Sequence, residues 1–241
     1  MPHRIILLGT THPGNIGAAA RAMKNMGLRD LVLVNPRYFP HPDATARASG
    51  ADDLLAAARV VGSLAEALDD CVYVAGASAR TRSIDWPSME LRDCVSRLLG
   101  ASRQGTVATV FGPEKSGLTN EDLDRCNTLL TIPADPDFSS LNLAMAVQIL
   151  CYEWRVATLE NRDPAPSSGV PLASGEQLQY FYGHLEQVLL LSGFLDPGNP
   201  RLLMRRLRRL FMRAAPDRNE INILRGILAS LDPDARKRNI N

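Results

Sequence analysis

Short, almost wholly apolar runs recur along the first half of the chain, and segments with helical periodicity separate them. Runs of this kind are typical of parallel strands, because such strands are buried on both faces and are joined by crossover helices. The pattern therefore predicts an α/β fold with a mostly parallel sheet. The expected strands are residues 4–8, 31–34, 72–75, 107–111 and 129–132.

The helical segments indicate where the chain divides. One helix is expected from about residue 18 to 26, and another from near Ser140 with Ser139 or Ser140 as its N-cap. Proline and serine are concentrated after residue 160, which is typical of an exposed linker, and further helical patterns follow. We expect a sheet domain over residues 1–160, a linker over residues 161–176 and a small all-helical domain over residues 177–241.

The carboxyl ends of the expected strands form the candidate site, because ligands of open parallel sheets bind there. The first loop, residues 9–17, is rich in glycine, but it has neither the Lys-Ser or Lys-Thr of a P-loop nor the G-x-G-x-x-G of a dinucleotide fold. The glycine-rich signature of the common Rossmann-type methyltransferases is absent after every strand. In the third loop Glu114 lies in a Gly-Pro-Glu-Lys-Ser-Gly segment, where no helix requires it.

Composition is that of an ordinary globular protein. Of the 241 residues 45% are hydrophobic and 22% are charged, and no apolar run approaches the roughly 20 residues of a membrane span. The four cysteines lie far apart without a C-x-x-C pair, so we expect neither a zinc site nor a disulfide framework. We expect a cytoplasmic protein with no membrane segment and no metal requirement.

Charge is divided unevenly along the chain. From residue 201 to the end there are eleven Arg or Lys against four Asp or Glu, a balance of +7, whereas the whole chain carries +1 and the first 200 residues therefore carry −6. Arginines crowded without an acid among them favour a phosphate partner, although a solvated helix face stays an alternative. The arginines that we expect to contact phosphate groups are Arg80 and Arg82 in the second loop and Arg205, Arg206, Arg208 and Arg209 in the tail.

Three motifs occur in order, each after an expected strand. They are Asn15-x-Gly17-x-x-x-Arg21, then Phe111-Gly112-Pro113-Glu114-x-x-Gly117-Leu118, then Ile132-Pro133 with Ser139-Ser140-Leu141-Asn142-Leu143-Ala144. They resemble the motifs of the SpoU/TrmH branch of the SPOUT RNA 2'-O-methyltransferases. Tail sequences such as Asn222-Ile223-Leu224-Arg225-Gly226-Ile227-Leu228 are similar to those of bacterial members that act on tRNA, so the resemblance covers nearly the whole chain.

The resemblance implies 2'-O-methylation of the cytidine or uridine at the start of the tRNA anticodon loop, with S-adenosylmethionine as methyl donor. It also implies a deep trefoil knot in the sheet domain and a homodimer whose sites combine residues of both protomers. The cofactor pocket would contain Ala77, Ser78, Ala79, Gly112, Ile132, Ser139, Ser140 and Leu141. The catalytic neighbourhood would contain Asn15, Arg21, Glu114, Ser140 and Asn142.

Among these residues Arg21 is the best candidate for contact with the reacting ribose oxygen. A guanidinium normally stays protonated, so it is a poor base but a good clamp for a neighbouring phosphate and a stabiliser of developing negative charge. Ser140 would hold the substrate or Arg21 by a hydrogen bond. Whether Arg21 also takes the proton stays open.

Two other classes of protein remain as alternatives. One is an RNA-binding protein on the same fold without catalysis, which the presence of Arg21, Glu114 and Asn142 disfavours. The other is a nucleotide-dependent α/β enzyme, which the missing phosphate-loop motifs disfavour. A methyl-transfer assay distinguishes the RNA-binding protein from a methyltransferase. A cofactor-binding screen distinguishes the nucleotide-dependent enzyme from a methyltransferase.

Overall fold

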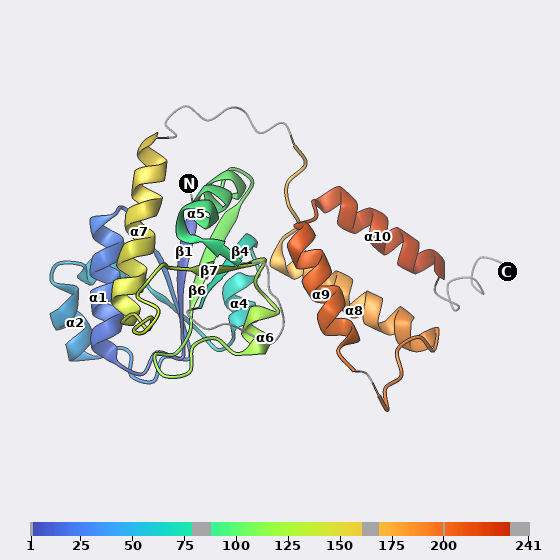
Figure 1. The fold of residues 1–241 in the computed structure, drawn as a ribbon, viewed down its shortest axis with the longest axis horizontal. Coiled ribbons are helices and arrows are strands. Elements are labelled where there is room, and N and C mark those ends of the chain that lie inside the picture. The colour runs from blue at the N-terminus through green and yellow to red at the C-terminus, as the bar shows by residue number, and fades with distance from the viewer. Residues whose placement is uncertain (1, 79–87, 161–168, 200, 232–241) are drawn as a thin grey trace.

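The computed structural model describes residues 2–78, 88–160, 169–199 and 201–231. Within them lies a seven-stranded sheet of order β3-β2-β1-β6-β4-β7-β5, in which every pair of neighbouring strands is parallel. The expected mostly parallel α/β fold is therefore confirmed (Figure 1). The strands are β1 (His3–Leu8), β2 (Asp30–Val34), β3 (Arg59–Val61), β4 (Cys71–Ala77), β5 (Ser88–Glu90), β6 (Thr106–Phe111) and β7 (Thr128–Thr131).

All five strands expected from the apolar runs are present, and each of their ends lies within two residues of the expected one. The two strands that the pattern missed, β3 and β5, have three residues each and lie at the two edges of the sheet. In each of them two of the three residues are exposed. A strand that is so short and so exposed does not produce an apolar run that could be recognised in the sequence.

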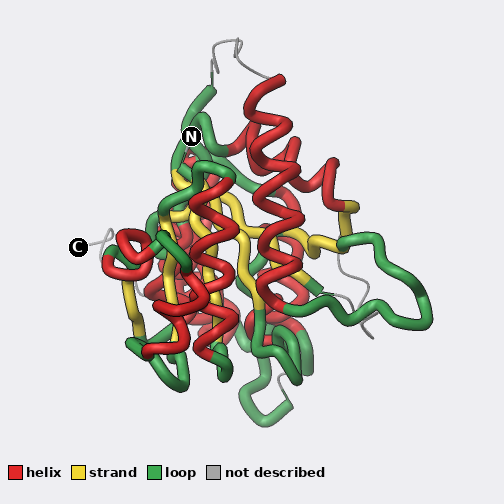
Figure 2. Tube along the Cα trace, turned by 90° about the vertical axis from the view of Figure 1, so that its left-hand side faces the viewer, coloured by secondary structure: helices red, strands yellow, loops and turns green. Residues whose placement is uncertain are grey.

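Helices cover both faces of the sheet, as the two ribbon and tube views show (Figures 1 and 2). The fully buried side chains of Ile5 and Leu7 on β1 belong to one apolar core, with α1, α5 and α7, whereas that of Ile6 belongs to a second core, with α4 and α6. The alternation follows from the pleat of the strand. The helices are α1 (Pro13–Asn25), α2 (Pro42–Ala48), α3 (Asp52–Ala56), α4 (Leu64–Leu68), α5 (Leu91–Ala101), α6 (Asn120–Leu123), α7 (Leu143–Glu160), α8 (Gly175–Leu191), α9 (Leu203–Ala214) and α10 (Arg218–Leu231).

Helices α1 and α7 start at other residues than the sequence suggested. Helix α1 begins at Pro13 rather than near residue 18, because proline suits the first turn, where its missing N–H is not needed. Helix α7 begins at Leu143, and its cap is neither Ser139 nor Ser140. The Oδ1 atom of Asn142 accepts hydrogen bonds from the backbone N–H groups of the first turn, at 2.9 Å and 3.4 Å.

The last three helices, α8 to α10, enclose an apolar core of their own. Its aromatic centre is Phe181, Tyr182 and Phe211, with the rings of Phe181 and Phe211 packed edge to face at 4.8 Å between centroids. Ser174 and Gln177 form a reciprocal capping box at the start of α8, so this helix begins at Gly175, two residues earlier than expected. An all-helical C-terminal region is thus present, while the division into domains and linker stays a prediction.

Candidate active site

An open pocket with a volume of about 150 Å³ lies at the carboxyl ends of β4, β6 and β7. Loops after these three strands form its walls, which is where a parallel sheet binds its ligands. Of the eight residues expected to bind the cofactor, Ala79 lies outside the described residues. The other seven all line the pocket, namely Ala77, Ser78, Gly112, Ile132, Ser139, Ser140 and Leu141.

The loop after β6 can form the pocket wall only because two of its residues are glycines. A Cβ atom on Gly112 would lie 2.4 Å from the backbone nitrogen of Leu118, a distance that no real side chain tolerates. Gly117 has a φ of +65°, in the left-handed region that favours glycine, and its N–H donates to the carbonyl of Pro113 at 2.8 Å. The loop is therefore closed tightly on itself, and it directs Glu114 away from the strand.

Glu114 holds the loop after β1 through both of its carboxylate oxygens. Its Oε2 atom accepts from the backbone N–H and the hydroxyl of Thr11, each at 3.0 Å. Its Oε1 atom accepts from the backbone N–H of His12 at 3.2 Å and from the Nδ2 atom of Asn15 at 3.0 Å. We call these four residues the Glu114 clamp; it joins the loop after β6 to the first turn of α1.

The clamp continues to the third motif through an amide pair. The Nδ2 atom of Asn142 donates to the Oδ1 atom of Asn15 at 3.1 Å, and the other end of the Asn142 side chain caps α7. One line of hydrogen bonds therefore runs from Glu114 through Asn15 and Asn142 to the start of α7. The three motifs, far apart in sequence, are fixed to one another.

These hydrogen bonds also set the protonation of Glu114. Partial burial raises the pKa of its carboxyl group, but the hydrogen bonds from Asn15 and Thr11 lower it by more, so the pKa lies below its ordinary value of 4.5. An ionised carboxylate that only accepts hydrogen bonds suits a residue that holds a loop in place.

Arg21 stands apart from this network. It is exposed on α1, six residues beyond Asn15, and its guanidinium has no hydrogen bond or ion pair with the part of the chain that the structure describes. A rise of about 1.5 Å per residue puts it roughly 9 Å farther along the helix axis than Asn15. Of the five residues expected to be catalytic, Asn15, Glu114 and Asn142 are hydrogen-bonded together and Ser140 lines the pocket, whereas Arg21 does neither.

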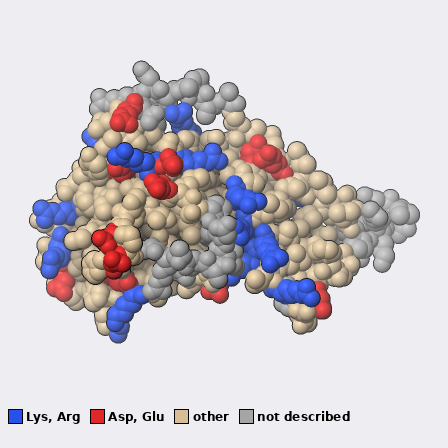
Figure 3. All heavy atoms as spheres, in the orientation of Figure 1, with Lys and Arg blue, Asp and Glu red and all other residues tan. Residues whose placement is uncertain are grey.

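The arginines expected to bind RNA differ in their surroundings. Arg205 is paired with Asp124 at 2.9 Å, and Arg208 donates to Gln179 while lying 4.8 Å from the centre of the Tyr182 ring. Arg206 is exposed and Arg209 is half-buried. Arg80 and Arg82 lie outside the described residues. Basic side chains gather where the helical region meets the sheet domain (Figure 3).

Sequence reasoning missed several residues that the site depends on. Thr11 makes two of the four hydrogen bonds to Glu114, and only its place in the glycine-rich first loop could have pointed to it. Gly17 was noted as part of a motif, and the structure gives the reason: a Cβ atom there would lie 1.9 Å from the carbonyl oxygen of Ala44 on α2. In the described part of the chain no three His, Cys, Asp or Glu side chains gather as a metal site, and none of the described helices is long and apolar enough to cross a membrane.

A sequence model described as the SpoU rRNA Methylase family matches residues 2–152, which is more than half of the chain. The chain belongs to this family. A second model, described as the C-terminal domain of the tRNA methyltransferase TrmJ, matches residues 176–240, and the resemblance seen in the sequence motifs is confirmed.

Relatives of the SpoU family match this chain from end to end. A Pseudomonas aeruginosa protein described as tRNA (cytidine/uridine/adenosine-2'-O-)-methyltransferase TrmJ is 52% identical over 97% of this chain and 95% of its own length. A Cronobacter sakazakii protein described as tRNA (cytidine/uridine-2'-O-)-methyltransferase TrmJ is 48% identical over 95% of each chain. The crystal structure of TrmJ from Z. mobilis ZM4 superposes with a TM-score of 0.83 at 39% identity, covering 96% of this chain and 99% of that one.

Proposed function

We propose that this chain is an S-adenosylmethionine-dependent tRNA 2'-O-methyltransferase that acts on the cytidine or uridine at the start of the anticodon loop. The observation that carries the proposal is the pocket at the ends of β4, β6 and β7, walled by the very loops whose motifs define the family. Relatives with a tRNA 2'-O-methyltransferase description match both parts of the chain, which supports tRNA as the substrate class. We place the protein in the cytoplasm, with its tRNA.

The pocket residues fit the cofactor chemically. Gly112 closes the loop that forms one wall, Leu130, Ile132 and Leu143 offer apolar walls to a purine ring, and the hydroxyl of Ser139 lies among them for polar groups. When bound, S-adenosylmethionine supplies an activated methyl group on a positively charged sulfur. The transfer needs no metal, because the chain has only to align the ribose oxygen and help it lose a proton.

Within this reaction the residues divide into two roles. Glu114, Asn15 and Asn142 keep the loops in register through the hydrogen bonds described above. Arg21 binds the phosphate next to the target ribose and stabilises negative charge on the 2'-oxygen, while Ser140 holds the ribose or the arginine. Free of intramolecular partners among the described residues, the Arg21 guanidinium is available for RNA.

We infer that the active unit is a homodimer with shared sites. A groove of about 1050 Å³ runs between α1, α2 and the start of α7, lined on α1 by Gly14, Ala18 and Ala22, and beside it Met145 of α7 is 62% exposed. Small side chains on one helix and an exposed methionine on the next favour a second copy as the occupant. A dimer across this groove also accounts for Arg21, which is exposed on α1, does not line the pocket of its own chain and would serve the partner's.

We infer a trefoil knot in the sheet domain from the resemblance of the three motifs to those of the family. Strand β7 enters between β4 and β5, although both were laid down earlier in the chain. The segment after β7, residues 132–142, then passes against the loop after β6, with which it shares the pocket. The contact between this segment and the loop after β6 agrees with the trefoil knot that the motifs imply.

Incubation of the protein with tRNA and isotopically labelled S-adenosylmethionine tests the proposal. Nucleoside mass spectrometry should find labelled 2'-O-methylcytidine or 2'-O-methyluridine, and nuclease mapping should place it at the start of the anticodon loop. Label in a base rather than a ribose, or label elsewhere in the tRNA, would overturn the assignment. RNA binding without any label would favour the non-catalytic alternative.

A further inference from the structure

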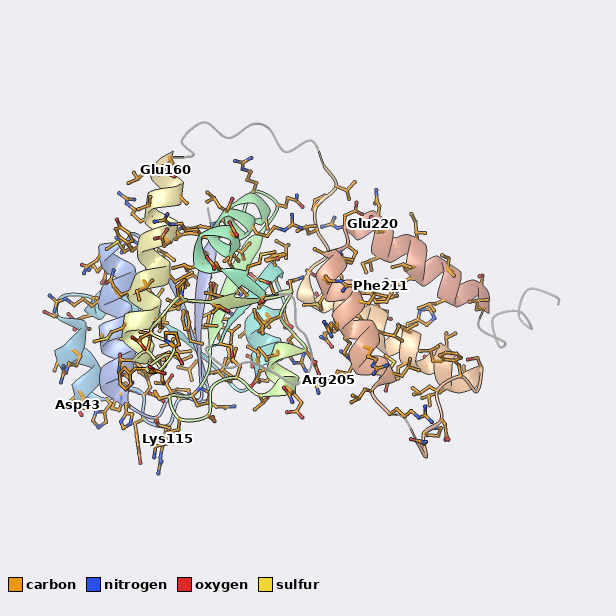
Figure 4. All side chains as sticks on the ribbon, viewed as in Figure 1. Asp43, Lys115, Glu160, Arg205, Phe211 and Glu220 are labelled. Atoms are coloured by element: carbon orange, nitrogen blue, oxygen red, sulfur yellow. The ribbon has the colours of Figure 1, made fainter. Side chains whose placement is uncertain are left out.

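The helical region contacts the sheet domain through an ion pair at the start of α9. The Nε atom of Arg205 donates to the Oδ1 atom of Asp124 at 2.9 Å, and the two side chains are only 22% and 17% exposed. Figure 4 shows Arg205 where α9 meets the end of α6. A guanidinium held in this way differs from that of Arg206, its neighbour, which is exposed to solvent.

A buried amide makes a second link beside the ion pair. Asn127 accepts from the backbone N–H of Val74 on β4 at 2.7 Å and donates to the carbonyl of Met212 on α9 at 2.9 Å. The asparagine is 6% exposed, so both hydrogen bonds are shielded from water. Because a buried polar group without a partner is costly, α9 is held at this one position on the edge of the sheet domain.

The first turn of α8 makes the third link. The N–H of Glu176 donates to the carbonyl of Asp69 at 3.1 Å, directly after α4. A Cβ atom on Gly175 would lie 2.5 Å from the carbonyl oxygen of Leu68, so only glycine permits this approach. The helical region is therefore seated on α4 as well as on the segment between α6 and β7.

That segment connects two walls of the cofactor pocket. Gly112, Glu114 and Ile132 line the pocket. Asp124 and Asn127 lie between them in the chain, after the loop that contains Gly112 and Glu114 and before Ile132. The basic helix α9 is thus fixed to the segment that connects two walls of the site. The exposed arginines of α9 therefore have a fixed position relative to the cofactor pocket.

We propose that Arg205, Asp124 and Asn127 form a docking latch that positions tRNA held by the helical region over the transfer site. Arg205 is then a positioning residue rather than one of the phosphate contacts expected for the tail. The inference rests on the proposed tRNA methyl transfer. It differs from that proposal in predicting a loss of rate without a loss of RNA affinity.

Replacing the acid of the latch gives the sharpest test, because simple charge attraction changes tRNA affinity whereas the latch changes the rate at saturating tRNA. Asp124→Asn removes a negative charge and frees Arg205, so simple attraction of a polyanion would bind tRNA more tightly. The latch predicts instead that the single-turnover methylation rate at saturating tRNA and S-adenosylmethionine falls about tenfold. The dissociation constant for S-adenosylmethionine should stay within about twofold of wild type, which shows that the variant is folded.

Arg206→Gln is the matched control on the same helix. It should weaken tRNA binding and reduce the slope of log affinity against log salt by about one unit, because an exposed arginine next to Arg205 can meet a phosphate. Arg205→Gln should leave that slope unchanged and slow single-turnover transfer as Asp124→Asn does. The exchanged pair, Arg205→Asp with Asp124→Arg, should recover most of the lost rate.

A glycine pair tests the same docking without touching any charge. Gly175→Ala introduces the clash with Leu68 and should slow transfer by displacing the helical region. Gly183→Ala in the same helix has nothing within 4 Å of its new Cβ atom and should behave as wild type.

The latch is overturned if Arg205→Gln lowers the salt slope as Arg206→Gln does, or if Asp124→Asn and Gly175→Ala transfer methyl groups at the wild-type rate. Failure of the proposed function looks different, since wild-type protein would then methylate no tRNA at all. The docking itself would still be visible in that case, as faster hydrogen exchange of the Glu176 backbone amide, which donates to the carbonyl of Asp69, in Asp124→Asn relative to wild type.

Discussion

The Glu114 clamp makes a prediction that separates holding a loop from taking part in chemistry. In Glu114→Gln one oxygen still accepts two hydrogen bonds, but the new amide NH₂ faces donors where an oxygen used to accept. At least two charge-assisted hydrogen bonds are lost, each worth about 1.5–3 kcal/mol in a buried setting. Because the clamp is partly open to water, which screens these bonds, we expect a loss of about 2 kcal/mol in the free energy of unfolding, below the roughly 3–6 kcal/mol that two fully buried bonds would give.

For a chain of this size each kcal/mol corresponds to about 2–4 °C, so the thermal midpoint should fall by about 4–8 °C. Differential scanning calorimetry of the protein without substrate measures this directly. Glu121→Gln is the matched control, because Glu121 is an exposed carboxylate just beyond the same loop, and its midpoint should equal that of wild type. Calorimetric titration should also find S-adenosylmethionine bound about tenfold more weakly by Glu114→Gln, since the loosened loop is a pocket wall.

Acid should erase the difference between wild type and Glu114→Gln. The folded pKa of Glu114 lies below its ordinary value of 4.5, so the carboxylate adds stability above that pH and loses it as the pH falls through the lower, folded value. The two unfolding curves should therefore converge as the pH falls below 4.5 and through the lower, folded pKa of Glu114. Glu114→Gln with an unchanged midpoint and S-adenosylmethionine affinity but no methyl transfer would refute the clamp, and would place Glu114 at the reacting atoms.

Three further predictions follow from single contacts. Arg21→Ala should slow tRNA methylation by more than about a hundredfold, on the order of 3 kcal/mol, while calorimetry finds S-adenosylmethionine affinity unchanged; loss of that affinity would contradict the assignment. Gly17→Ala should lower the free energy of unfolding by about 3 kcal/mol in urea titration through its clash with α2, whereas Gly14→Ala, whose nearest new neighbour would be 3.5 Å away, should not. Burial lowers the pKa of His3 from 6.5 to about 3. As the pH falls between those two values the unfolded chain gains a proton that the folded chain does not, so the free energy of unfolding of wild type should decline by up to about 1.4 kcal/mol per pH unit. His3→Gln should show a shallower decline.

Much of the fold was visible in the sequence because parallel strands buried on both faces are continuous apolar runs. What the runs could not show was the order of the strands: β7 lies between β4 and β5, and nothing in residues 128–131 indicates its neighbours. Helix starts were also missed, because several polar residues precede α7 and only the folded chain decides which of them is the cap. Asn142 rather than Ser140 is the N-cap of α7, and its side chain is held in place by a hydrogen bond to Asn15.

The candidate site divides in the same way. Pocket residues such as Gly112 and Ile132 could be transferred from the motifs by position, since the motifs follow the strands whose ends form the pocket. The pairing of Arg205 could not be foreseen, because its partner Asp124 is 81 residues away and lies in a segment without any of the three motifs. Counting arginines predicts a basic helix correctly but says nothing about which of its charges are already neutralised inside the protein.

Position in a motif and role in the reaction are therefore separate inferences. The side chains of Glu114, Asn15 and Asn142 form hydrogen bonds with one another and with the loops around them. Few of their donors and acceptors are therefore available to a substrate. Arg21 is exposed and has its guanidinium free toward the described part of the chain, although it comes from the same motif as Asn15. A rigid arrangement of three loops around one uncommitted cation is what methyl transfer needs, because the chemistry is a displacement that depends on alignment and on charge at the attacking oxygen.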